Sequence, residues 1–459
     1  MHQIKGVIRF YPFETSTESG RSQERLRRVA ITALSSMFAK LVAVATTLIS
    51  VPLTINYLGE EKYGLWMTIS SVIALLAFAD LGIGNGLLNA ISEANGKDDP
   101  TLARSYVSST FFMLLGLAVI LGGCFAALYP FLPWARIFNI TTPGAIADAG
   151  PAVYAFVGCF LVNMPLGTVS RIQSGYQEGF SSNLWTAGGN ILGLLGVLLV
   201  IHFQGTLCWL VLAMAGAPIL AVAINGWRLF GWDRPWLRPR WRFASHLAAR
   251  KVLGMGLLFF ILQFAVAAAF SSDNIIAAQI LGSAAVTQYS VHARLFSIAP
   301  MLLMMAMGPL WPAYSEAIAR GDIAWARRTL IRSLVASLVL SGLLSLILVI
   351  AGPWLLKIWV GDKVTPVFSL LLGLGVWTVL WSAGNALAMF LNGANVMRFQ
   401  VITALTMASL AVLLKIVFTQ RIGLFGIVLG TIVAYTVAVM IPSLIIVPKK
   451  LAVWSQRKQ

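Results

Sequence analysis

The sequence predicts an all-α polytopic membrane protein with about twelve transmembrane helices arranged in two lobes of six. Of its 459 residues, 58% are hydrophobic and only 11% are charged. A soluble domain carries about 25% charged residues. A bilayer span needs about 20 consecutive apolar residues, so twelve spans would use about half of the chain. This composition excludes a soluble enzyme and a nucleic-acid-binding protein.

Apolar runs bounded by Gly, Pro, Asn and charge clusters divide the chain into twelve segments of the required length. The first six spans are expected near 30–56, 63–91, 105–129, 150–171, 183–203 and 206–227. The second six are expected near 252–280, 288–313, 330–352, 366–391, 400–419 and 424–447.

Basic residues set the predicted orientation. With the N-terminus in the cytoplasm, 25 of the 33 Lys and Arg residues lie on the cytoplasmic side and five on the outside. This ratio follows the positive-inside rule, so both termini are expected in the cytoplasm. The predicted domains are a basic N-terminal arm (1–29), an N-lobe (30–227), a basic linker (228–251), a C-lobe (252–447) and a tail (448–459).

The linker 228–251 permits two interpretations. It can simply tie the two lobes together, which is the simpler explanation of its position. Alternatively, its Trp and Arg side chains lie at the membrane surface, with Trp at the headgroup level and Arg facing anionic lipid.

Short sequence matches recur at an offset of 223 residues. Ser-Glu-Ala at 92–94 returns at 315–317, and Leu-Gly at 58–59 returns at 281–282. Each half holds six spans, an even number, so both halves run in the same direction through the membrane. This pattern predicts two lobes related by an axis along the membrane normal, with a substrate path between them.

Several enzyme classes are disfavoured. The three cysteines form no CxxC pair, so neither a disulfide framework nor a zinc site is expected. The largest outside loop, 130–149, holds two charged residues, whereas membrane-embedded sugar transferases, polymerases and ligases keep acidic catalytic groups in sizeable loops. The sequence has no GxxxxGK[ST] phosphate-binding loop. We therefore predict no catalytic residue and no metal site.

Charged side chains at bilayer depth cost about 2.5–3.5 kcal/mol and call for an explanation. In the first lobe, Lys40 lies near the middle of the first span and is expected to face a cavity. Asp80 lies deep in the second span, where Asn85 and Asn89 share one helical face. These three residues either line a sugar or ion path or hydrogen-bond between closely packed helices.

In the second lobe, Asp273 lies within a run of four polar residues in the seventh span. It is the best candidate for a coupling ion or a proton, and the alternative is a structural salt bridge with Arg294 of the eighth span. Arg294 is also a candidate for binding phosphate, because its planar guanidinium matches phosphate oxygens. Lys415, near the end of the eleventh span, is expected to extend to the interface.

Two helix breaks are expected to line the path. Asn163 with Pro165 marks one in the fourth span, and Gly384 with Asn385 marks the other in the tenth. Arg171 is expected to be an anchor at the cytoplasmic edge of span four.

Several motifs of the chain resemble those of the polysaccharide transporter family, within the multidrug/oligosaccharidyl-lipid/polysaccharide superfamily. The turn after span one carries the family's pattern at Leu58, Gly59, Tyr63 and Gly64. The glycine-rich stretch that contains Asp80 and Asn89 is similar to the family's second span. In the second half, DNIIAAQILGSAAVTQYSV and LNGANVMRFQ resemble its seventh span and the turn after span ten.

This resemblance implies a flippase of the bacterial inner membrane. Its substrate would be an oligosaccharide repeat unit, of O-antigen, capsule or exopolysaccharide, linked by pyrophosphate to a polyprenyl lipid. Lys40 and Arg294 fit the binding of the diphosphate, and Asp273 and Asp80 the coupling to H⁺ or Na⁺ without a cofactor. Membrane lipids, a polysaccharide polymerase and chain-length proteins are the implied partners.

Two other transporter classes remain to be compared. A cation-coupled multidrug exporter of the same fold usually carries acidic residues deep in the first span, where this chain has Lys40. A major-facilitator carrier would show GxxxDRxGRR between its second and third spans, whereas this chain has EANGKDDPTLAR.

Overall fold

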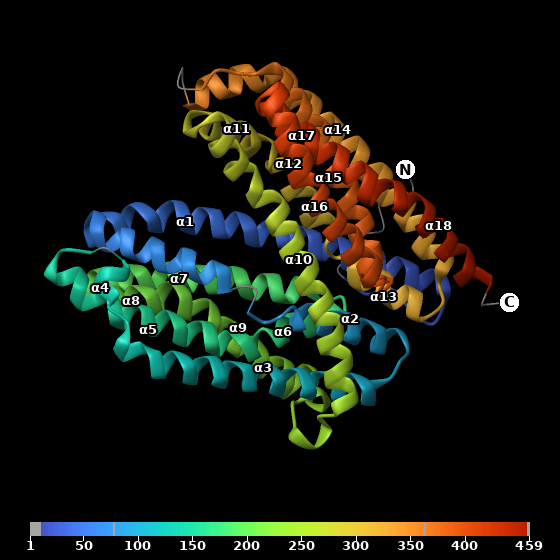
Figure 1. Cartoon of the computed structure of the whole chain (residues 1–459). Coiled ribbons are helices and arrows are strands. Elements are labelled where there is room, and N and C mark those ends of the chain that lie inside the picture. Colours follow the sequence, from blue (N-terminus) through green and yellow to red (C-terminus); the bar gives the residue numbers. More distant parts are fainter. Residues whose placement is uncertain (1–10, 77–78, 139, 361–363, 457–459) are drawn as a thin grey trace. The chain divides into compact units, whose positions relative to one another are not determined.

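The computed structural model describes residues 11–76, 79–138, 140–360 and 364–456. Within these ranges the chain is helical and no strand is assigned, which confirms the all-α prediction (Figure 1). Eleven helices or helix runs of this part are long and apolar enough to cross a membrane. They coincide with eleven of the twelve predicted spans. The predicted second span, 63–91, contains residues outside the described part.

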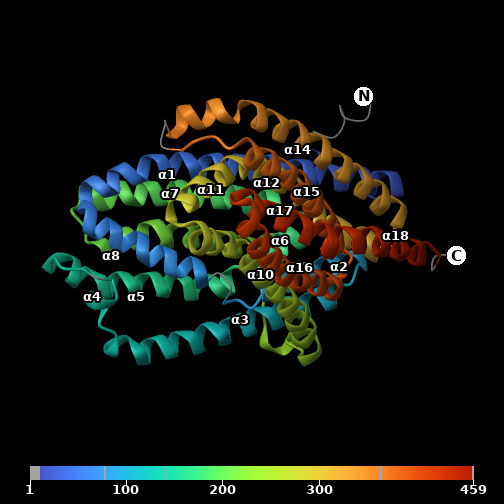
Figure 2. The same ribbon diagram turned by 45° about the horizontal axis from the view of Figure 1, so that its top comes forward.

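The chain divides into two compact units, Met1–Leu257 and Leu258–Gln459, and the division falls inside α10. The helices of the first unit are α1 (Glu18–Leu76), α2 (Ile83–Gly96), α3 (Pro100–Leu128), α4 (Trp134–Ile137), α5 (Pro143–Leu166), α6 (Thr168–Gly175), α7 (Gly179–His202), α8 (Leu207–Val211) and α9 (Ala217–Arg228). Short 3₁₀ or π turns are η1 (Tyr129–Phe131), η2 (Leu212–Gly216), η3 (Leu229–Asp233), η4 (Pro235–Leu237) and η5 (Trp241–Phe243). Helix α1 packs along α7 (Figures 1 and 2).

The second unit begins within α10 (His246–Leu281). It continues through α11 (Ser283–Phe296), α12 (Ile298–Met307), α13 (Leu310–Ala319), α14 (Ile323–Val360), α15 (Phe368–Gly393), α16 (Met397–Ile422), α17 (Leu424–Tyr435), η7 (Thr436–Met440) and α18 (Ile441–Gln456). Its closest helix pairs are α16 with α17 and α14 with α15.

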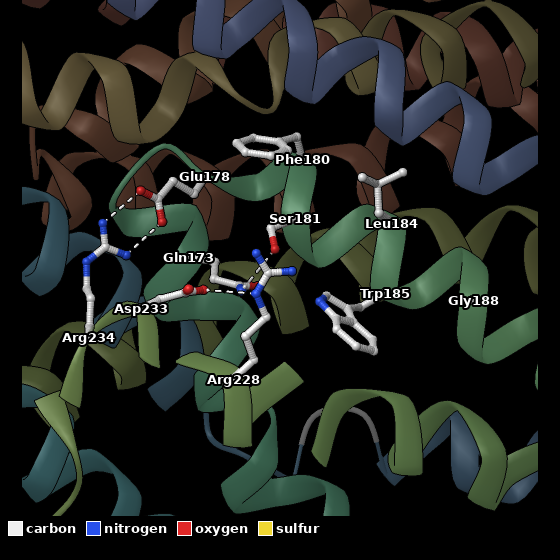
Figure 3. Close-up of a pocket in the computed structure, with 10 residues that line it drawn as sticks. All are labelled: Gln173, Glu178, Phe180, Ser181, Leu184, Trp185, Gly188, Arg228, Asp233 and Arg234. Carbon is white, nitrogen blue, oxygen red and sulfur yellow. Dashed lines mark hydrogen bonds and ion pairs between the residues drawn. The ribbon is translucent and has the colours of Figure 1, made fainter. Parts of the chain in front are cut away.

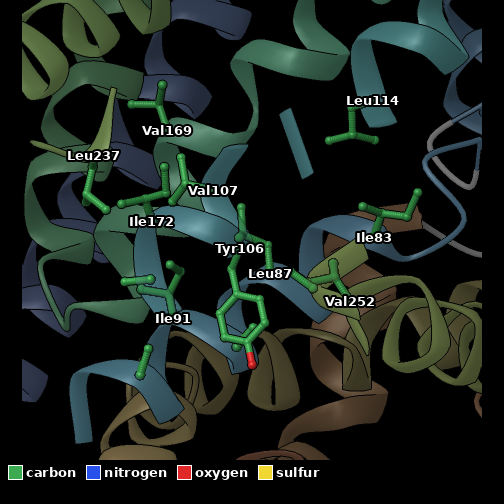
Figure 4. Close-up of a cluster of buried hydrophobic side chains, with 14 of the residues drawn as sticks. Ile83, Leu87, Ile91, Tyr106, Val107, Leu114, Val169, Ile172, Leu237 and Val252 are labelled. Carbon is green, nitrogen blue, oxygen red and sulfur yellow. The ribbon is translucent and has the colours of Figure 1, made fainter. Parts of the chain in front are cut away.

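The core of the first unit lies where α2, α3 and α6 meet (Figure 4). Ile83, Leu87 and Ile91 recur every four residues and place one apolar face of α2 against the other two helices. Leu237 of the predicted linker is fully buried in the same cluster. The linker is therefore packed onto the first unit and is not an extended tether.

The backbone reproduces the internal repeat. Gly59 has φ 75° and ψ 170°, and Gly282, 223 residues later, has φ 87° and ψ 171°. Asp98 and Gly321, separated by the same offset, both have positive φ, 52° and 77°. The repeated Leu-Gly match therefore marks two turns of the same local conformation, because positive φ is adopted routinely only by glycine and a few short polar residues.

Two segment boundaries differ from the expected ones. Helix α1 begins at Glu18, inside the predicted arm 1–29. The predicted second span is interrupted: α1 continues to Leu76, a turn follows at 79–82, and α2 begins at Ile83. Gly82 in the left-handed conformation (φ 70°) permits this turn.

Of the two predicted helix breaks, one is confirmed and one is wrong. The break beside Asn163 and Pro165 is present, because α5 ends at Leu166 and α6 begins at Thr168. The break at Gly384 is absent, since α15 runs unbroken through it. A Cβ at Gly384 would lie within 1.6 Å of the Tyr435 hydroxyl oxygen, so this glycine allows close packing of an aromatic ring.

A steric prediction follows from the contact between α16 and α17. A Cβ at Gly426 would lie 2.3 Å from the carbonyl carbon of Phe418, which is backbone and cannot rotate away. We expect Gly426→Ala to lower the free energy of unfolding by about 1–3 kcal/mol, through overpacking. Thermal unfolding in detergent measures the change. The control is Gly342→Ala in α14, where a Cβ meets nothing within 4 Å and no loss is expected. Equal melting temperatures for the two variants would contradict the prediction.

A second prediction concerns the turn after the first span. The Glu61 carboxylate accepts hydrogen bonds from the backbone N–H groups of Thr141 (2.6 Å) and Thr142 (3.2 Å), at the start of α5. These bonds lower the pKa of Glu61 from 4.5 to about 2. Because the pKa of Glu61 is lower in the folded state, the two hydrogen bonds stabilise the turn above pH 4.5. This stabilisation is lost as the pH falls toward 2 and the carboxylate is protonated.

We therefore expect Glu61→Gln to raise deuterium uptake at 140–146 at neutral pH. The wild-type protein should lose this protection only on acidification toward pH 2. Unchanged deuterium uptake in the variant, measured by hydrogen exchange with mass spectrometry, would show that the hydrogen bonds to Glu61 do not order this loop.

Candidate functional site

The second unit contains a buried ion pair. Lys415 of α16 has no solvent-exposed surface, and its Nζ lies 2.5 Å from Oδ1 of Asp273 on α10. The ammonium group also donates to the carbonyl oxygen of Ala269 at 2.7 Å. The second carboxylate oxygen accepts a hydrogen bond from the hydroxyl of Tyr289 on α11, at 2.7 Å. Three helices thus converge on one neutralised carboxylate.

This geometry corrects two predictions. Lys415 does not extend to the interface, and the partner of Asp273 is Lys415 and not Arg294. Arg294 is exposed on α11. The error arose because sequence spacing places residues along a helix but does not show which helix packs against it. A cation could bind Asp273 only in place of the Lys415 ammonium group.

In the first unit, Asp80 lies in the turn between α1 and α2. Its Oδ1 accepts a hydrogen bond from the backbone N–H of Gly82 at 2.9 Å, so the carboxylate stabilises the start of α2. A Cβ at Gly84 would lie 3.0 Å from Nε of Arg171 and 3.1 Å from Oδ2 of Asp80. Arg171 of α6 was expected only as an anchor. Its guanidinium and the Asp80 carboxylate instead both lie next to Gly84.

The three predicted asparagines differ in exposure and lie on two helices. Asn89 is buried and Asn85 half-buried, and both lie on α2. Asn163 is exposed on α5, and its carbonyl oxygen accepts a hydrogen bond from the N–H of Gly167 at the helix break.

Lys40 is exposed on α1. The face of α1 that packs against α7 contains Ala39 and Ser50, both buried, and Ser35, which accepts a hydrogen bond from Asn183 at 3.0 Å. Lys40 lies about 100° around the helix from Ala39 and shares its exposed face with Thr47, two turns further on. The exposed side of the first span, otherwise largely apolar, therefore carries one positive charge.

These positions define a charge pattern within the spans. Each of the two deep carboxylates, Asp80 and Asp273, has a cation beside it, Arg171 and Lys415 respectively. Lys40 and Arg294 are exposed, and within the described ranges neither has an acidic partner within ion-pair distance. The exposed intramembrane charges named here are thus positive, which favours an anionic ligand.

A hollow of about 670 Å³ lies in the first unit between α6, α7 and η3 (Figure 3). Its two arginines are paired: Arg234 binds Glu178 through two bonds of 2.6 and 2.7 Å, and Arg228 lies 3.4 Å from Asp233. The guanidinium of Arg234 also lies 4.1 Å from the ring centre of Tyr176, whose pKa burial raises to about 12. This hollow is therefore close to electrically neutral, and sequence reasoning missed it because its walls come from distant segments.

Comparison with known proteins places this chain among membrane proteins linked to polysaccharides. Residues 25–318 match the family described as polysaccharide biosynthesis protein. A protein of Salmonella typhi, named as an O-antigen transporter, is 21% identical over 90% of this chain and 95% of its own length. A Yersinia pseudotuberculosis protein, named for O-antigen export, is 22% identical over 62% of this chain and 65% of its own length.

Solved structures share the fold. A MATE transporter in its bent conformation has a TM-score of 0.79 at 15% identity, covering 95% of this chain and 98% of its own. An outward-facing multidrug-resistance MATE transporter has a TM-score of 0.77 at 15% identity, covering 94% of this chain and 96% of its own. A superfamily transporter from Pyrococcus furiosus, reported to have a binding pocket of reversed polarity, has a TM-score of 0.75 at 14% identity, covering 93% of this chain and 96% of its own.

Proposed function

Because the chain belongs to the polysaccharide biosynthesis protein family, we propose that it is a flippase for polyprenyl-pyrophosphate-linked oligosaccharide repeat units. It is a multi-pass membrane transporter and not an enzyme. The observation that carries the proposal is similarity, along about nine-tenths of the chain, to proteins named as O-antigen transporters. The repeat unit would move from the inner to the outer leaflet of a bacterial inner membrane by alternating access.

The charge pattern supports an anionic substrate. A diphosphate has several acceptor oxygens, and charge-assisted hydrogen bonds from Lys or Arg to phosphate are about twice as strong as neutral ones. Lys40 in the first unit and Arg294 in the second are both exposed, and each is proposed as a cation that can bind phosphate. Asn85, half-buried, and Asn163, exposed, would offer amide groups to sugar hydroxyls, whereas Asn89 is buried and could do so only after a rearrangement of α2.

Ion coupling is a further part of the proposal. We propose that a gradient of H⁺ or Na⁺ drives the cycle and that Asp273 takes up the ion when the ammonium of Lys415 moves away. Asp80 is the second candidate for taking up the ion, with Arg171 as the cation that would move away from it. No cofactor is required by this scheme. A polysaccharide polymerase and chain-length proteins would be the functional partners.

The second candidate function is a cation-coupled multidrug exporter, which the shared fold with multidrug-resistance MATE transporters favours. An organic cation needs an accessible carboxylate, however, and both deep carboxylates here have cations beside them. The first span carries Lys40 as its one charged residue between 29 and 59.

Deletion of the gene in its native host separates these functions. We expect complete lipid-linked repeat units to accumulate, measured by mass spectrometry of extracted polyprenyl lipids, while surface polysaccharide is lost. Unchanged lipid-linked sugars and surface polysaccharide, with increased drug susceptibility, would contradict the flippase and support the exporter.

A further inference from the structure

A second hollow, of about 360 Å³, opens on the first unit on the other side of η3. Its walls come from α3, the break between α5 and α6, the end of α9, and residues 238–239. The side chains that shape it are Phe111, Leu166, Trp227, Phe230 and, at one edge, Arg238. Four separate segments thus form one largely apolar groove, which we call the α3–α9 groove.

Three exposed tryptophans lie in or near the segments that form the α3–α9 groove. Trp227, Trp232 and Trp241 are 67%, 64% and 74% exposed. Each of them packs against another aromatic ring. The ring centroids of Trp227 and Trp232 are 4.7 Å apart, and those of Trp241 and Phe112 are 4.9 Å apart. Ordered, exposed tryptophans at the end of membrane-spanning helices are typical of the headgroup level of a bilayer.

Charge distinguishes the α3–α9 groove from the neutral hollow of Figure 3. There each arginine has a carboxylate partner. Arg238 is the one charged residue among those that line the α3–α9 groove. It is exposed, donates one hydrogen bond to the carbonyl oxygen of Phe230 at 3.4 Å, and has no acidic partner within the described residues. Its guanidinium therefore retains donors for an anion.

We propose that the α3–α9 groove binds an anionic phospholipid of the surrounding bilayer. An acyl chain lies against the apolar walls, and the phosphate accepts hydrogen bonds from Arg238 at the edge. Of the seven Lys and Arg residues in the segment 228–251, three form ion pairs with carboxylates. The other four make the field around the headgroup positive; they are Arg238, Arg240, Arg242 and Arg250. Basic pockets between membrane helices recognise anionic lipid headgroups by this combination of charge and apolar surface. The proposal adds a specific bound lipid to the interpretation that the segment 228–251 lies at the membrane surface. It does not depend on what the protein transports.

Native mass spectrometry of the full chain in detergent tests the proposal, with phosphatidylglycerol and phosphatidylcholine as probes. Wild-type protein is expected to retain one phosphatidylglycerol in preference to phosphatidylcholine. Arg238→Gln should weaken binding of phosphatidylglycerol about fivefold and leave phosphatidylcholine unaffected. The matched control is Arg398→Gln, which removes an exposed arginine at the start of α16 that does not line the groove.

A second measurement locates the lipid. Phosphatidylglycerol with a photoreactive acyl chain is expected to label peptides that contain Phe111 or Trp227, and Trp227→Ala should reduce the labelling. Equal binding of the two lipids to the wild type, equal loss in both arginine variants, or labelling confined to other helices would each overturn the proposal. Melting temperatures of the variants establish that they are folded.

Discussion

Replacing Lys415 with Met alone is expected to destabilise the second unit by about 3–5 kcal/mol. The substitution leaves the carboxylate of Asp273 buried without its ammonium partner, and Tyr289 alone cannot compensate a full negative charge. Unfolding in detergent or by steric trapping in a bilayer measures the loss.

The double variant Lys415→Met with Asp273→Asn tests the cause. It removes both charges and keeps an acceptor for Tyr289, so it should recover most of the lost stability. The control is Arg421→Met, which removes an exposed charge from the same helix and should change stability by less than about 0.5 kcal/mol. A double variant as unstable as the single one would show that Lys415 acts through packing and not through its charge.

Replacing Lys40 with Ala is expected to reduce export about tenfold or more while leaving the protein folded. Its side chain is exposed and makes no ion pair within the described residues, so the substitution removes little folded-state stabilisation. A hydrogen bond to a charged group contributes about 1.5–3 kcal/mol, which corresponds to at least a tenfold change in binding. Surface polysaccharide in a deletion strain that expresses the variant measures the effect.

Two further variants define the role of the charge. Lys40→Arg should retain most of the export, because it keeps a cation at this position. Leu41→Ala, on the apolar exposed side of α1, should export normally. Wild-type export by Lys40→Ala at normal protein level would remove Lys40 from the substrate path.

The fold was largely predictable because each span is encoded locally. An apolar run of about 20 residues can cross a bilayer whichever helix it packs against. The internal repeat was also visible, since Gly59 and Gly282 repeat both in sequence and in backbone conformation. The second span was predicted less well. The sequence around the turn at 79–82 stays largely apolar and does not show that Gly82 adopts a positive φ and interrupts the helix.

The polar contacts were less predictable because they depend on packing between distant segments. Asp273 and Lys415 are 142 positions apart, and the hydrophobicity of α16 did not show that Lys415 faces inward. One signal was available: Lys415 lies within an apolar run that also contains Ala411 and Thr419 at helical spacing, and all three are buried. Asp80 and Arg171 were each identified from the sequence, but only the folded chain brings both to Gly84.

Transbilayer movement of the substrate itself tests the central claim most directly. Purified protein is reconstituted into liposomes with a polyprenyl-diphosphate oligosaccharide extracted from the host, and a membrane-impermeant glycosidase reports the sugars in the outer leaflet. We expect the cleaved fraction to rise from about half toward completion with the wild type and to rise far more slowly with Lys40→Ala. A cleaved fraction that stays at about half with folded wild-type protein, with and without an imposed H⁺ or Na⁺ gradient, would contradict the flippase assignment.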